Sequence, residues 1–427
     1  MGIVKNNVTK HTARLINIFL VVFVDMTGFG LIMPLLPYYA EQFNATPFEI
    51  GLLVASFAAA SLLGAPLMGR LSDRYGRRPV LLLSVVGTLI GYLFLGFAPP
   101  IGHILASLFT SHAVNAFTIG TIFFGRIIDG LTAGNISVAQ AYISDVTDEV
   151  DRSRGLGVIG SAFGLGFIIG PAVGGLLSQG GYSHPSFAAA ILAFVNLISI
   201  FFFLPESLTD ERRALIMHQH PPSVTYKALA TAIRRPKVGP LLLLRFFIML
   251  AYTGFWSDFA LFAQSKLKLN MQSTGLVMAY IGFYSVLVQG VGIGLLTRRF
   301  KDNTIIITSL WLLFIGLVGW SLTSNLPVML LVILPLAGGA WTLNTILTSA
   351  ITKAVQPDEI GGMLGISAAS DSTTRMVAPA FAGFMLGNNG AWELGMVSAS
   401  LILLTILFAY WRILLVNEPV EPKPADL

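Results

Sequence analysis

Six ionisable side chains lie inside long apolar runs of this sequence: Asp25, Arg126, Asp129, Asp258, Asp371 and Arg375. If these runs cross a membrane, each such group costs at least ~2.5–3.5 kcal/mol to insert, so it needs a function or a partner. A buried carboxylate can load and release a proton, because burial favours its neutral form and a nearby cation favours its charged form. Arginine stays charged and tunes the carboxylates around it. The pattern therefore favours proton coupling across a membrane.

The composition supports a membrane protein. Of the 427 residues, 55% are hydrophobic and 11% are charged, whereas soluble domains carry roughly 25% charged residues. We predict twelve spanning helices from the apolar runs, at 15–40, 49–69, 79–97, 117–141, 154–178, 186–204, 239–263, 273–297, 304–323, 326–350, 361–386 and 394–415. All but four of the 26 lysines and arginines fall on one side of these spans, which marks that side as cytoplasmic and places both termini there.

The one long polar segment, 205–238, divides the chain into two predicted six-helix bundles, 1–204 and 239–427. Within it, 224–233 is either a short amphipathic helix on the membrane surface or plain linker. The halves repeat each other: Thr27-Gly28-Phe29 recurs as Thr253-Gly254-Phe255. Such repeats are typical of transporters that bind substrate between the halves.

Other function classes find little support. The sequence has no P-loop, nucleophile elbow or metal-ligand spacing, so we expect neither an enzyme nor a cofactor. His103 and His112, in the apolar outer loop 99–117, have no carboxylate or cysteine companions, so we expect no metal site. The net charge of +5 reflects orientation signals in short loops and does not predict nucleic-acid binding.

Two glycine-containing motifs stand out in the first half of the chain. The first is a basic loop between the second and third spans, with Gly69, Asp73, Arg74, Gly76, Arg77 and Arg78. The second is a run in the fifth span, with Gly166, Gly170, Pro171, Gly174 and Gly175. Small residues at every fourth position of a helix let a neighbouring helix approach closely, and a proline inside a helix bends it.

These strings, together with 25–37 and 125–134, resemble the drug–proton antiporter branch of the major facilitator superfamily, which includes the tetracycline exporters. The resemblance implies an all-α protein of twelve transmembrane helices in two pseudo-symmetric bundles. It further implies a monomer in the plasma (inner) membrane that uses the proton gradient for multidrug efflux and antibiotic resistance. The basic loop would form a cytoplasmic gate, its arginines pairing with Asp145, and the glycine run would be the bend of the export branch.

The resemblance also suggests roles for the buried charges. Asp25, Arg126 and Asp129 would couple protons, although the family often has a neutral residue at the position of Asp129, which is spaced to neutralise Arg126 permanently. Asp371 and Arg375 either pair with each other or face the cavity. Asp258 is expected to be structural and Arg245 to reach the inner interface. Trp256 and Trp341 lie deep enough to line a substrate cavity.

The leading interpretation is a proton-coupled exporter of small hydrophobic or amphipathic compounds. One alternative is a proton symporter or facilitator for a nutrient such as a sugar, which a more polar cavity would favour. Another is a transport-inactive sensor or receptor with the same fold. The ninth span, 304–323, has no acidic residue, unlike some tetracycline exporters, which argues against tetracycline itself.

Overall fold

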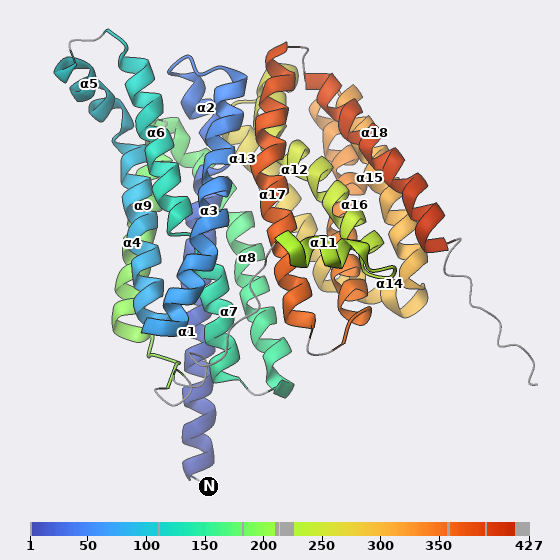
Figure 1. The fold of residues 1–427 in the computed structure, drawn as a ribbon. Helices are drawn as coiled ribbons and strands as arrows, with labels where there is room; N and C mark the ends of the chain where they lie inside the picture. Colours follow the sequence, from blue (N-terminus) through green and yellow to red (C-terminus); the bar gives the residue numbers. More distant parts are fainter. Residues whose placement is uncertain are drawn as a thin grey trace, which may run out of the picture. The chain divides into compact units, whose positions relative to one another are not determined.

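The computed structural model describes residues 2–109, 112–147, 149–181, 183–209, 213, 226–356, 359–388 and 391–414. Within these ranges the chain is helical and contains no strand (Figure 1). The described residues belong to two compact units. The larger unit comprises Met1–Pro222, Trp256–Tyr284 and Ser372–Ala391, and the smaller comprises Ser223–Phe255, Ser285–Asp371 and Trp392–Leu427.

The larger unit is built on the first half of the chain. Its helices are α1 (Gly2–Ile32), α2 (Leu36–Glu41), α3 (Pro47–Tyr75), α4 (Arg77–Gly96), α5 (Ala98–Leu108), α6 (Val114–Leu131), α7 (Asn135–Val146), α8 (Glu149–Leu177), η1 (Ser178–Gly180) and α9 (His184–Phe203). It also contains parts of α12 (Gly239–Leu267), α13 (Met271–Leu287) and α17 (Ile360–Asn388). Helix α1 packs against α7, α8 and α9, while α4 packs against α6 and α9. The core consists of buried aliphatic side chains from these helices.

The smaller unit contains the remaining parts of α12, α13 and α17. Its other helices are α11 (Tyr226–Arg234), η2 (Val288–Gly292), α14 (Ile293–Arg299), α15 (Asp302–Leu322), α16 (Leu326–Lys353), α18 (Ala391–Ala409), which begins in the larger unit, and η3 (Tyr410–Leu414). Helices α15 and α16 pack along each other, and Gly339 and Gly316 sit where this contact leaves no room for a side chain. Helix α11 falls in the polar segment, where the sequence left open a helix or plain linker.

Among the described residues, eleven helical segments are long and apolar enough to cross a membrane. They match eleven of the twelve predicted spans. Helix α17 occupies the position of the remaining one, and its 29 residues are long enough to span. The polar run Asp371–Arg375 lowers its hydropathy. A polar stretch of this kind is tolerated at membrane depth where it faces protein or a water-filled cavity.

Two predicted spans are interrupted. The first ends as α1 at Ile32 and resumes as α2 after a turn, because Pro34 and Pro37 remove backbone donors. The fourth is divided into α6 and α7 by residues 132–134, and Figure 1 shows both as separate segments. The outer loop 99–117 is also not a plain loop, since α5 occupies much of it.

The break between α6 and α7 is stabilised by one hydroxyl. Ser84 on α4 is fully buried, and its Oγ donates a hydrogen bond to the Thr132 carbonyl. The same oxygen accepts a hydrogen bond from the Gly134 N–H at 3.3 Å. Serine side chains commonly satisfy backbone groups that a broken membrane helix leaves free. The backbone groups that the interruption would leave unpaired therefore have a hydrogen-bond partner in Ser84.

Candidate functional site

Asp25 lies in the C-terminal half of α1, inside its apolar stretch Leu15–Ile32, and contacts the start of α7. Asn135, the first residue of α7, donates a hydrogen bond from its Nδ2 to Asp25 Oδ1 at 2.7 Å. Asn135 is 7% exposed, and its Oδ1 is buried with no hydrogen-bond partner among the described residues. The break after α6 thus places the amide of Asn135 beside the carboxylate of Asp25, the residue proposed from the sequence for proton coupling.

Arg126 and Asp129 form a buried ion pair on α6. Arg126 is 0% exposed, and its Nη1 lies 2.9 Å from Asp129 Oδ2. Thr88 on α4 hydrogen-bonds the Asp129 carboxylate. The guanidinium carbon lies 4.3 Å from the centre of the Phe57 ring, within the range of a cation–π contact. The local pair that the i,i+3 spacing allows is therefore present.

The Arg126–Asp129 pair and Asp25 lie close enough to influence each other. Asp129 lies within electrostatic range of Asp25. Tyr92 on α4 lies within electrostatic range of both carboxylates and of Arg126. Burial weakens screening by solvent, so charges here interact more strongly than on a surface. Protonation or deprotonation of Asp25 therefore changes the electrostatic energy of the Arg126–Asp129 pair.

The glycine run of α8 forms a close seam with α1. A side chain at Gly170 would meet the backbone of Gly30 and Thr27, and one at Gly174 would meet the backbone of Leu31. Gly166 packs in the same way against Met26 and Thr27. Pro171 lies inside α8. The seam holds α8 directly against the helix that carries Asp25.

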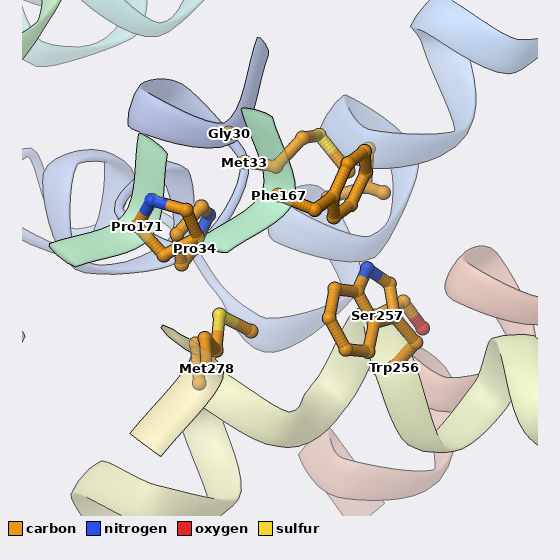
Figure 2. Close-up of a pocket in the computed structure, with 10 residues that line it drawn as sticks. Gly30, Met33, Pro34, Phe167, Pro171, Trp256, Ser257 and Met278 are labelled. Carbon is orange, nitrogen blue, oxygen red and sulfur yellow. The ribbon is translucent and has the colours of Figure 1, made fainter. Parts of the chain in front are cut away.

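A small pocket opens beside this seam (Figure 2). Its lining residues are Gly30, Met33, Pro34, Val54, Phe167, Pro171, Trp256, Ser257, Ala260 and Met278. All of them belong to the larger unit, and all except Ser257 are apolar or glycine. The cavity volume is about 10 Å³, about enough for one water molecule. Met33 connects the pocket to the charges, because its sulfur lies 3.6 Å from Arg126 Nη2.

A second group of charges lies where α3 meets α4. We call Ser72, Asp73, Arg77 and Asp145 the Arg77 cluster. Arg77 is buried, and its Nη1 donates to Asp73 Oδ1 at 2.6 Å and to Ser72 Oγ at 2.7 Å. Its Nε donates to Asp145 Oδ2, near the end of α7, at 3.0 Å. The structure therefore brings Arg77 and Asp145 together, as the family resemblance of the basic loop implies.

The other residues of this basic loop are less constrained. Gly76 has a φ of +107°, a conformation that favours glycine, and it separates α3 from α4. Arg78 donates to the Phe201 carbonyl, and Arg74 lies over the Tyr75 ring. Gly69 has open space where a Cβ would lie. Of the two glycines in this loop, Gly76 alone has a backbone conformation that favours glycine.

Glu206 anchors the same loop and was not singled out from the sequence. Its carboxylate accepts hydrogen bonds from the backbone N–H groups of Arg77 and Arg78, at 2.9 and 3.1 Å. These are the first two residues of α4, whose N-terminus favours a negative charge. Ser207 continues the contact by donating to Asp145 at 3.1 Å. The residues after α9 therefore hold the Arg77 cluster in place.

The smaller unit has its own buried ion pair. Arg245 on α12 is 7% exposed, and its Nε and Nη2 donate to the two oxygens of Asp371 at 3.0 and 2.7 Å. Its Nη1 donates to Thr348 at 2.7 Å. Asp371 is thus paired with Arg245. The sequence had left open whether Asp371 and Arg375 pair with each other or face the cavity, and Arg375 is exposed. The prediction that Arg245 reaches the interface was wrong, because Asp371 and Thr348 satisfy it inside.

The two deep tryptophans occupy different surroundings. Trp256 lines the pocket, with its ring centre 6.2 Å from that of Phe167. Trp341 belongs to the smaller unit and packs edge-to-face on Tyr252 at 6.0 Å. Asp258 is 2% exposed within α12. Among these three, the pocket includes only Trp256.

Comparison with known proteins identifies the family. Residues 18–353 and 241–427 match the profile of the Major Facilitator Superfamily. The chain is 29% identical over 403 residues to the class H tetracycline resistance protein of Pasteurella multocida, covering 92% of this chain and 96% of that protein. It is 30% identical over 384 residues to the class C protein of Escherichia coli, covering 87% and 89%. Solute carrier family 22 member 18 of Rattus norvegicus is 27% identical over 391 residues, 91% of each chain.

Solved structures support the fold. The human organic anion transporter MFSD10 aligns with a TM-score of 0.67 at 22% identity, covering 93% of this chain and 99% of its own. The nucleoside transporter NupG aligns with a TM-score of 0.70 at 12% identity, covering 94% and 99%. The predicted all-α membrane fold is therefore confirmed. The chain belongs to the Major Facilitator Superfamily and is a multi-pass membrane transporter, not an enzyme.

Proposed function

We propose that the protein exports small hydrophobic or amphipathic compounds in exchange for protons, by alternating access. The observation that carries this proposal is the link between charge and pocket. A fully buried arginine, paired with Asp129, contacts Met33, and Met33 lines the apolar pocket. Substrate that displaces Met33 therefore acts on the charges around Asp25.

Asp25 is the proposed proton carrier. Its carboxylate takes up one proton and becomes neutral, and it returns to the charged form when the proton leaves on the other side. The Arg126–Asp129 pair stays charged throughout, because arginine does not release its proton in proteins. Protonation of Asp25 removes one negative charge close to Asp129. The charged and the protonated form of Asp25 therefore differ in their repulsion from Asp129. This difference in free energy can shift the equilibrium between two arrangements of the helices.

The pocket supports an apolar substrate. Ligand sites usually enclose about 300–1,000 Å³, whereas this pocket has about 10 Å³. Substrate therefore requires the segments of α12 and α13 to move away from α1 and α8. Figure 2 shows the parts that must separate: Met278 and Trp256 on one side, and Pro34 and Pro171 on the other. A lining of methionine, aromatic and proline side chains suits a hydrophobic compound better than a sugar.

The Arg77 cluster is the proposed cytoplasmic gate, in a protein that lies in the plasma (inner) membrane with both termini inside. Its basic loop supports this orientation through the excess of arginine. Gly69, Arg74, Gly76 and Arg78 would shape that loop. A gate that opens in every cycle needs contacts that can be broken, and the half-exposed Asp73 carboxylate provides one.

The remaining candidates are assigned as follows. Arg375, exposed on α17, is proposed to contact an anionic group of the substrate. Asp371 is proposed to be structural, because Arg245 satisfies both of its oxygens. Trp341 is proposed to line the substrate path of the smaller unit. We further propose that the protein works as a monomer without a cofactor.

The test is pH-driven transport in proteoliposomes. Purified protein is reconstituted, a pH gradient is imposed, and uptake is measured for tetracycline, a lipophilic cation, an amphipathic anion and a sugar. Tetracycline is included because the relatives are named for resistance to it. We expect accumulation of at least one apolar or amphipathic compound, abolished by a protonophore. Accumulation of the sugar alone would instead support the nutrient symporter.

A further inference from the structure

Helix α7 joins the two charged sites of the larger unit. Its first residue, Asn135, donates to Asp25 at 2.7 Å, and Asp145, near its end, accepts from Arg77 at 3.0 Å. Ten residues separate Asn135 from Asp145, which is about 15 Å along an α-helix. One short helix therefore contacts the proposed proton carrier at one end and the Arg77 cluster at the other.

A break in the helical backbone separates α7 from α6. Residues 132–134 are not helical, and the Thr132 carbonyl and Gly134 N–H bind Ser84. Because Ser84 supplies their hydrogen bonds, this carbonyl and this N–H do not depend on a continuous α6–α7 helix for a partner. Gly134 also packs directly on Met68 of α3, where a larger side chain would collide. The break therefore has the properties of a hinge with its polar groups satisfied.

The amide of Asn135 can serve both forms of Asp25. Its Nδ2–H₂ donates to the carboxylate, as the structure shows. A protonated Asp25 carries an O–H that needs an acceptor, and Asn135 Oδ1 is buried with no partner among the described residues. A rotation of the amide exchanges donor for acceptor. Asn135 thus has a different contact for each protonation state.

We propose that α7, turning at the 132–134 hinge, transmits protonation of Asp25 through Asn135 to the Arg77 cluster. Asn135 is then a positioning residue for coupling. This inference rests on the proposed function, since it takes Asp25 as the proton carrier. It adds the route by which the proton opens the cytoplasmic side.

The other groups that face Asp25 are known from the elements around it. Asp129 and Arg126 come from α6 and Tyr92 from α4. From residue 157 onward α8 has no ionisable side chain, and α9 has only His184, at its first position. Arg126 and Asp129 are paired with each other. At its N-terminal end, α7 therefore contacts the charge of Asp25 directly, through Asn135.

The test uses a thiol at the end of α7. The chain has no cysteine, so Thr147→Cys introduces a single reporter at a buried position that follows α7 directly. Labelling by a water-soluble maleimide is measured against pH on the full-length protein in detergent. We expect labelling to be about tenfold faster when Asp25 is protonated, the factor that one hydrogen bond to a charged group is worth. Thr209→Cys, which is exposed, corrects for the pH dependence of the thiol itself.

Two asparagine variants decide the route. Asn135→Leu in the reporter background should reduce the pH effect to less than about twofold. Asn196→Leu is the matched control, because Asn196 is also buried and donates to the backbone of α1, at the Val21 carbonyl one turn before Asp25, and not to the carboxylate. That variant should keep the full effect. If Asn135→Leu does not fold, Ser84→Ala, which removes the hydroxyl at the hinge, should reduce the effect in its place.

The outcomes separate this inference from the proposed function. Asp25→Asn should remove the part of the pH effect that comes from Asp25, so that only the contribution of the carboxylates in the Arg77 cluster remains. A full pH effect in both Asn135→Leu and Ser84→Ala overturns the role of α7. Labelling that is independent of pH in the parent overturns it too. Proton release on addition of substrate, followed with a pH-sensitive dye, tests in either case whether proton coupling itself stands.

Discussion

Replacement of Asp129 by asparagine tests the balance of charge around α6. The change keeps the size of the side chain and removes the carboxylate that lies 2.9 Å from Arg126 Nη1. Arg126 is 0% exposed, so its guanidinium cannot turn to water. Breaking a buried pair by removing one partner costs about 3–5 kcal/mol. The cation–π contact with Phe57 does not involve Asp129, so it is not expected to offset this loss.

This cost is large for a folded protein, whose net stability is typically about 5–15 kcal/mol. Asp129→Asn should therefore lower the thermal midpoint and the yield of folded protein. The double variant Arg126→Met, Asp129→Leu removes both charges and should recover most of the stability, because apolar replacement of a buried pair is often neutral. It should still transport poorly, since Asp25 loses the charges that tune it.

The assay is thermal unfolding of the purified variants, followed by loss of the monodisperse peak on size-exclusion chromatography. Transport is measured on the same preparations. A single variant as stable as the parent would show that Arg126 is not held by Asp129. A double variant with full coupled transport would remove the pair from the mechanism and leave it a structural feature.

Three further changes have clear expected results. Gly170→Ala should destabilise the protein by about 1–3 kcal/mol, because its Cβ would lie 2.7 Å from the backbone of α1, whereas Gly160→Ala, with open space at that position, should have little effect on the thermal midpoint. Asp145→Asn removes an acid of the Arg77 cluster and should lower turnover more than substrate affinity; a large loss of equilibrium binding at unchanged turnover would contradict the gate. Arg235, which hydrogen-bonds Glu359 at 2.7 Å, holds the pKa of that carboxyl below its ordinary value. Because the pKa of Glu359 is lower in the folded state, the pair stabilises the fold at pH values above the pKa of an unfolded glutamate, about 4.3. This stabilisation is lost as the pH falls through the pKa of the folded state, so the Tm difference between the parent and Glu359→Gln should disappear in acid. A Tm difference that persists in acid would contradict the pairing.

Local spacing predicted the parts of the site that depend on one helix. The three-residue interval from Arg126 to Asp129 allowed their pair, and the sequence displays that interval directly. The contact between Arg77 and Asp145 joins two helices, and it was expected only because the basic loop resembles that of the antiporter family. The position of Asp25 within an apolar run also predicted that it lies inside a membrane-spanning helix, as it does in α1.

The contacts that the sequence did not predict depend on residues far apart in the chain. Asp371 is paired with Arg245, 126 positions away, and no local pattern distinguishes that partner from Arg375. The role of Asn135 depends on the break that Ser84 stabilises from another helix. Gly134 followed by a polar residue was the one available signal, since such a pair often begins a helix. Glu206 was visible only as part of a polar linker.

Exchange at Asp25 tests the central proposal most directly. Proton movement on addition of a transported compound is measured in proteoliposomes containing the parent, Asp25→Asn, or Asp258→Asn as a second buried aspartate on another helix. We predict that Asp25→Asn folds and exchanges substrate across the membrane without moving protons, while Asp258→Asn moves protons as the parent does. Proton movement at the parent rate in folded Asp25→Asn would contradict the account.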